Sequence, residues 1–229
     1  EGTGTTLSLS SLDGMVNPGS SLTSNVIISS ASASDYIPLS MNKGALILDR
    51  NVNLDSSSEL YKRSEFSSVK VDLTSGNSIT GSQSGQTGIA QRNYENSSGK
   101  DAVKITNDGS IALTGNNAVG IASDYGHVVN NSTVKTTGEK SVAIYSANGT
   151  TTENNGEIVI GGNNSAGIYG ANYLDGVNSS AVLKYGDDKI DISNNSRIIS
   201  EGTGKVYGIY ADNKYLSRND SAVRLGSGS

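Results

Sequence analysis

Apolar residues recur with a period of two in many short segments of this chain. Ile111/Leu113, Val142/Ile144, Ile158/Ile160 and Ala166/Ile168 each alternate with polar or small residues. This alternation is typical of a strand with one buried face, whereas an amphipathic helix would repeat every 3.6 residues. The pattern therefore predicts an all-β protein.

These segments belong to an internal repeat. Its copies are NDGSIALTGNNAVGIAS (107–123), NNSTVKTTGEKSVAIYS (130–146), NNGEIVIGGNNSAGIYG (154–170) and NNSRIISEGTGKVYGIYA (194–211), with a fainter copy at 75–91. One Ile recurs at 121, 144, 168 and 209, so the motif is constant while the spacing varies. A further short strand precedes each Asn pair, as at Ile105, Val128 and Ile192. Three short strands per repeat predict one rung of a parallel β-helix, a solenoid.

Asn and Gly mark the corners of the predicted rungs. Asn recurs at 107, 130/131, 154/155 and 194/195, and Gly recurs at 115, 138, 162 and 202. We expect the Asn residues to adopt the left-handed bend and to bond to the same amide one rung away. At the Gly corner a side chain would clash. The Asn column is interpreted as a structural ladder, in preference to an ice- or sugar-binding array.

The first part of the chain repeats poorly. Val26/Ile28 and Val52/Leu54 alternate as strands do, but the Asn and Gly spacing is missing and Ser-rich stretches intervene. We expect residues 1–65 to form irregular rungs or a tip-like region with long loops. Residues 66–229 should form regular repeats with insertions at 91–101 and 170–188.

Composition and charge exclude several classes of protein. The net charge is -5 and the Lys and Arg residues are scattered, which argues against nucleic-acid binding. No apolar run approaches the ~18 residues of a membrane-spanning helix, so we expect no membrane insertion. The chain has no Cys and a single His, which argues against thiolate chemistry, multi-histidine metal sites and any cofactor. Because it begins with Glu1 and shows no signal peptide, we expect a fragment of a longer chain.

Catalytic residues are not evident in the repeats. Asp187, Asp188 and Asp191 form an acidic cluster, but no matching acid occurs in the neighbouring repeats, so a solvated loop is the favoured interpretation. His127 follows a short turn and is interpreted as a surface residue. The sequence therefore predicts that the protein is not an enzyme.

The positions of the tyrosines say more about function than the acidic residues do. Tyr145, Tyr169 and Tyr210 follow the aligned Ile, so alternation puts them on the outer face as an aromatic column. Such a column either stabilises the stack or serves sugar stacking or protein docking.

Insertions of different length all follow this Ile-Tyr strand. We expect them at 91–101, 123–126, 146–150, 170–188 and 211–221. Loops that share one corner of a solenoid emerge along one edge, where binding surfaces form. Tyr and Arg concentrate there as at interface anchors. The candidate ligand-binding residues are Arg92, Tyr94, Tyr173, Leu174, Tyr185, Tyr215 and Arg218.

The repeats over about residues 69–211 resemble passenger repeats of type V autotransporter adhesins, especially the very large fusobacterial ones. The units NNGEIVIGGNNSAGIYG and NNSTVKTTGEKSVAIYS carry this resemblance. It implies export across the outer membrane, a right-handed parallel β-helix at the cell surface, and adhesion to host cells or bacteria. The signal sequence and the translocating barrel of the family do not occur in this sequence, and no ligand-contact residue carries over.

Three functions remain open at this point. An adhesin segment would bind a host-cell or bacterial surface receptor, a protein or a glycan, through the insertion edge. A purely structural stalk or spacer would hold a distal tip away from the cell. A β-helix enzyme that acts on polysaccharides ranks third. We expect the segment to be monomeric and extracellular, as part of an outer-membrane-anchored autotransporter.

Overall fold

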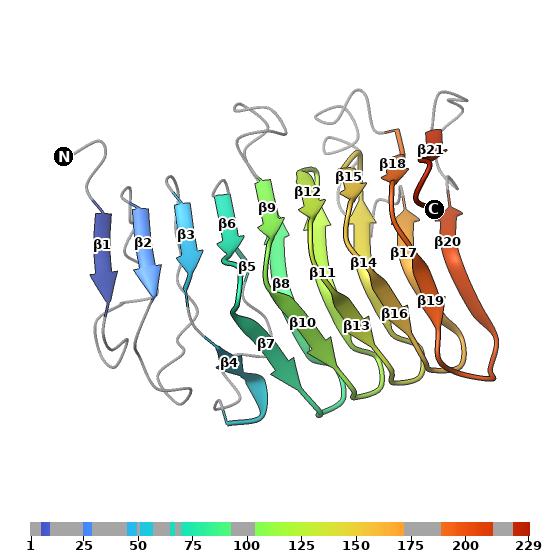
Figure 1. The fold of residues 1–229 in the computed structure, drawn as a ribbon, viewed down its shortest axis with the longest axis horizontal. Coiled ribbons are helices and arrows are strands. Elements are labelled where there is room, and N and C mark those ends of the chain that lie inside the picture. The colour runs from blue at the N-terminus through green and yellow to red at the C-terminus, as the bar shows by residue number, and fades with distance from the viewer. Residues whose placement is uncertain are drawn as a thin grey trace, which may run out of the picture.

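Parallel strands make up most of the described part of the protein in the computed structural model (Figure 1). The structure describes residues 6–9, 25–28, 45–49, 51–56, 65–66, 70–92, 104–171, 189–212 and 222–229. These residues contain a single short 3-10 turn, Leu54–Ser56, and no α-helix. The predicted all-β class is confirmed.

The strands form three sheets, named S1, S2 and S3. S1 has nine strands: β1 (Thr6–Leu9), β2 (Asn25–Ile28), β3 (Ala45–Leu48), β6 (Lys70–Leu73), β9 (Lys104–Asn107), β12 (His127–Asn130), β15 (Thr151–Asn154), β18 (Asp191–Asn194) and β21 (Ala222–Leu225). S2 has six: β4 (Val52–Asn53), β7 (Ser78–Gly81), β10 (Ser110–Leu113), β13 (Val134–Thr136), β16 (Ile158–Ile160) and β19 (Ile198–Ser200). S3 also has six: β5 (Glu65–Phe66), β8 (Thr87–Arg92), β11 (Val119–Asp124), β14 (Val142–Ala147), β17 (Ser165–Ala171) and β20 (Val206–Asp212).

From β3 onward the strands belong to S1, S2 and S3 in turn, and one such passage is called a rung below. Each strand pairs in parallel with the equivalent strand of the next rung, so repeats that are far apart in sequence lie side by side (Figure 1). Ile121 is in register with Ile144, and Ile144 with Ile168, as the repeat alignment requires. Stacked parallel sheets of this kind are consistent with the predicted parallel β-helix.

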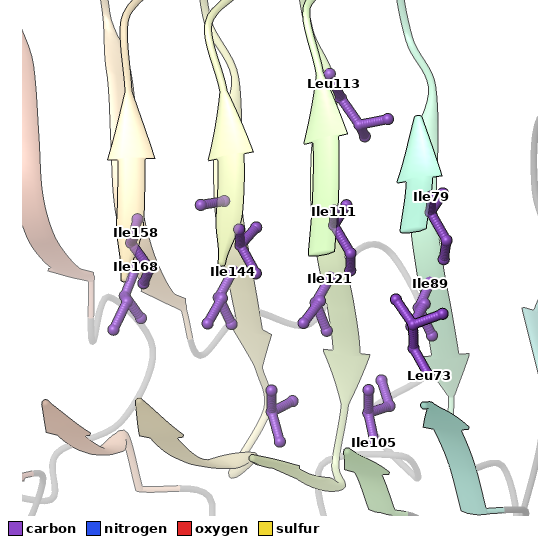
Figure 2. Close-up of a cluster of buried hydrophobic side chains, with 14 of the residues drawn as sticks. Leu73, Ile79, Ile89, Ile105, Ile111, Leu113, Ile121, Ile144, Ile158 and Ile168 are labelled. Atoms are coloured by element: carbon purple, nitrogen blue, oxygen red, sulfur yellow. The ribbon is translucent and has the colours of Figure 1, made fainter. Parts of the chain in front are cut away.

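A continuous apolar core lies between the sheets. Figure 2 shows the inward side chains of successive rungs, among them Ile111, Ile121 and Ile144, which are completely buried. Burial of an aliphatic side chain of this size contributes about 1.5–3 kcal/mol, so stability accumulates from rung to rung. One predicted inward residue is wrong. Val142 is half-buried and the next residue, Ala143, is fully buried, at a position of β14 where the strand pairing is skipped although the register is the same on both sides.

The Gly corner, between S2 and S3, is confirmed as a place of close backbone approach. A Cβ atom built on Gly138 would lie 1.9 Å from the carbonyl oxygen of Gly115, and one on Gly162 would lie 1.9 Å from that of Gly138. Real Cβ atoms do not approach backbone oxygens so closely. The column therefore admits glycine because it carries no side chain.

The Asn corner contains the predicted amide ladder, which is fully buried. Each amide donates a hydrogen bond to the side-chain oxygen of the next, at 2.7, 2.7 and 2.6 Å along Asn107, Asn130, Asn154 and Asn194. The predicted left-handed conformation at these Asn residues is wrong, since they end the strands of S1. Positive φ angles occur instead at Asn117, Lys140 and Asn164, in the turns before S3, and at Tyr125 and Asn148, in the turns after it.

The N-terminal strands β1, β2 and β3 extend S1 with the same parallel pairing as the later strands. The sequence pattern does not predict β3. Asp55, in the 3-10 turn, accepts hydrogen bonds from the Ser82 backbone amide at 2.8 Å and the Ser82 hydroxyl at 2.7 Å. These bonds, the backbone one above all, lower the pKa of the Asp55 carboxyl. The boundary between residues 65 and 66 stays a prediction.

Candidate ligand-binding surface

The C-terminal ends of the S3 strands form one edge, from which the chain passes to S1 in every rung. The residues of this insertion edge are in register: Arg92, Asp124, Ala147, Ala171 and Asp212. The connections that leave it range from Tyr125–Gly126 to the long segment between β17 and β18. Every expected insertion thus follows a strand of S3, and the prediction that the insertions share one corner of a solenoid stays a prediction.

Most of the predicted ligand-binding residues lie outside the described part of the chain. These are Tyr94, Tyr173, Leu174, Tyr185, Tyr215 and Arg218. Their convergence on a ligand stays a prediction. Arg92 was expected in a loop, but it is the last residue of β8 and pairs with Asp124 of β11. The expected insertions at 91–101 and 170–188 accordingly start later, after Arg92 and Ala171, because the strands continue further than the Ile-Tyr motif indicates.

The short turns at the insertion edge are held by polar contacts. Asn148 donates a side-chain hydrogen bond to Asp124 Oδ1 of the preceding rung at 3.0 Å. Asn148 and Gly149 both have positive φ angles, which forms a tight reversal. Thr150, the next residue, is buried. Its hydroxyl donates a hydrogen bond to the carbonyl oxygen of Ala147 at 2.7 Å and accepts one from the Gly126 amide at 3.2 Å. The edge is therefore held by hydrogen bonds where its turns are short.

Beside this edge lies the predicted aromatic column, the tyrosine row of Tyr145, Tyr169 and Tyr210. The three residues are in register on β14, β17 and β20, and Ala122 takes the equivalent place on β11. The rings of Tyr145 and Tyr169 are 5.4 Å apart in an edge-to-face arrangement, and those of Tyr169 and Tyr210 are 5.2 Å apart and tilted. Tyr210 is 42% exposed, so the row is open to solvent at its last ring.

A further tyrosine joins this row. Tyr207 lies 5.4 Å from Tyr210, and the Lys205 ammonium lies 5.3 Å from the centre of the Tyr207 ring. A hydrogen bond with Tyr207 raises the pKa of the Lys205 ammonium. Sequence reasoning missed Tyr207, because strict alternation from Ile209 places it inward. Tyr207 pairs with Ala166 and Ile209 pairs with Ile168, but Gly208 between them has no pairing partner. This skipped position places Tyr207 on the outer face although Ile209 faces inward.

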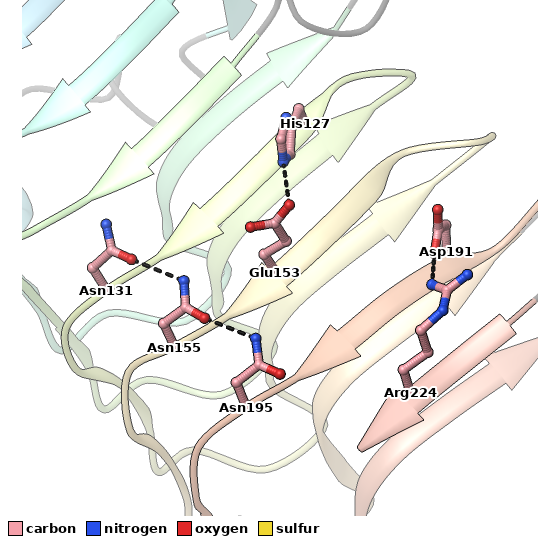
Figure 3. Close-up of polar contacts among 7 residues, drawn as sticks. All are labelled: His127, Asn131, Glu153, Asn155, Asp191, Asn195 and Arg224. Carbon is pink, nitrogen blue, oxygen red and sulfur yellow. Dashed lines mark hydrogen bonds and ion pairs between the residues drawn. The ribbon is translucent and has the colours of Figure 1, made fainter. Parts of the chain in front are cut away.

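Polar and ionic contacts join neighbouring strands on the outer face of S1 (Figure 3). His127 Nε2 lies 3.3 Å from Glu153 Oε1, and Asp191 pairs with Arg224. Asp191 was expected in an acidic loop, but it begins β18, whereas Asp187 and Asp188 lie outside the described residues. In the part of the chain that the structure describes, no three potential metal ligands converge.

A second, exposed column of Asn runs along the corner between S1 and S2. Asn155 donates to Asn131 at 3.1 Å, and Asn195 donates to Asn155 at 2.9 Å (Figure 3). Asn131 in turn donates to Asp108 at 2.8 Å. Because neighbouring rungs bond to each other along this column, its amides serve the stack as the structural interpretation expects.

Comparison with known proteins identifies no relative of this chain. No family model, no curated protein and no solved structure matches this chain. The resemblance to autotransporter repeats thus stays a prediction. Among the described residues no helix is long and apolar enough to cross a membrane.

Proposed function

We propose that the three sheets form a right-handed parallel β-helix and that the chain is a segment of a cell-surface adhesin. It would bind a host-cell or bacterial receptor, a protein or a glycan, through the insertion edge. The segment would be displayed outside the cell as part of an autotransporter passenger. The resemblance of the repeats supports the location and the handedness, and the register of the rungs supports the helical path.

The observation that carries the binding function is the single edge from which every S3-to-S1 connection leaves. Rungs with short turns show that the stack requires very little chain there, as at Tyr125–Gly126. The much longer segment between Ala171 and Lys189 therefore exceeds what the fold needs. Long connections inside compact domains are uncommon without a function, and rigid rungs would limit the entropy lost on binding.

A structural spacer is the second candidate, and the two Asn columns favour it. They bond consecutive rungs inside and outside the core, which suits a stiff rod. An enzyme is the third candidate and the least supported. In the described residues Asp191 is paired with Arg224, and His127 contacts Glu153, so neither residue stands in a group of acids on adjacent rungs.

The test compares the chain with a variant in which residues 172–189 are replaced by Asn-Gly. This copies the turn at Asn148–Gly149 and leaves Ile190 in the buried place that Thr150 occupies one rung earlier. Fluorescently labelled protein is titrated onto host epithelial cells, onto other bacteria and onto arrays of glycans and receptor ectodomains.

We expect saturable binding by the chain and at least tenfold weaker binding by the variant, with unchanged circular dichroism. A matched control, Lys135→Ala on the outer face of S2, should keep full affinity. Full affinity in the shortened variant would eliminate the edge as the binding site. Absence of binding by the parent chain to every surface would overturn the adhesin and favour the spacer over it.

A further inference from the structure

We draw no further inference here: the strongest candidate, the end of the stack at β19, β20 and β21, where Val223 and Leu225 continue the inward-facing positions of β18 and are 45% and 68% exposed, carries nothing because nothing in the described part of the structure shows what covers it.

Discussion

Removal of one side chain of the buried Asn ladder should destabilise the protein far more than removal of the exposed Asn side chain next to it. Asn154 is completely buried, accepts a hydrogen bond from Asn130 at 2.7 Å and donates one to Asn194 at 2.6 Å. Asn155 makes the same two kinds of bond, at 3.1 and 2.9 Å, on the exposed column. The two adjacent residues thus differ mainly in burial.

The magnitudes follow from what each substitution leaves behind. Asn154→Ala strands a buried amide on Asn130 and a buried carbonyl on Asn194, and each unsatisfied group costs about 1–3 kcal/mol. The free energy of unfolding should therefore fall by about 4 kcal/mol. After Asn155→Ala, water reaches the neighbouring amides, so the loss should stay below about 1 kcal/mol.

The assay is unfolding in urea, monitored by far-ultraviolet circular dichroism. The two variants are compared on condition that the slope of the unfolding free energy against urea concentration is unchanged. If the two substitutions lower the free energy of unfolding equally, the ladder at Asn154 is not buried as described. Reasoning from burial at this corner would then be refuted.

Three further predictions concern the register, the corners and the N-terminal rungs. Ile144→Asp should cost several kcal/mol by burying an unpaired charge, while Lys140→Ala should change little; equal melting temperatures would show that the strand faces are misassigned. Gly138→Ala should lower the melting temperature strongly because of the backbone contact, whereas Gly208→Ala, which meets nothing within 4 Å, should not. The lowered pKa of Asp55 stabilises the folded state above the unfolded pKa, and this stability is lost as the pH falls through the folded value. Asp55→Asn should reduce that acid dependence, and an unchanged acid titration would contradict it.

The repeat made most of the fold predictable. A column of identical residues, such as the Asn column that includes Asn154, requires stacking in register, and its buried ladder follows from amide chemistry. The conformation at each corner could not be derived in this way. Asn tolerates a left-handed bend, but the structure places that bend on Lys140 as well as on Asn117 and Asn164, where the path of the turn decides it.

The place of the S3-to-S1 connections was predictable, but their bounds and neighbouring residues were not. Variable loop length located the insertion edge, because insertions in a solenoid accumulate where the rungs tolerate them. Arg92 was misplaced because the parallel pairing with Asp124 prolongs β8 past the motif. The outward position of Tyr207 was not predicted, because a skipped pairing position turns its side chain outward. Alternation of apolar residues alone contains no signal for such a skip.

Cross-linking across neighbouring rungs tests the in-register stack most directly, and the chain has no native Cys to interfere. Ala112 of β10 pairs with Lys135 of β13, which pairs in turn with Val159 of β16. Neighbouring parallel strands lie ~4.8 Å apart, which is within the Cα separation that a disulfide spans. Two strands with a third strand between them lie about twice as far apart, which is too far for a disulfide. Oxidation of Ala112→Cys/Lys135→Cys should give an intramolecular disulfide, visible as a faster-migrating species on a non-reducing gel. Ala112→Cys/Val159→Cys should remain reduced; cross-linking of this second pair, or failure of the first, would contradict the stacked rungs.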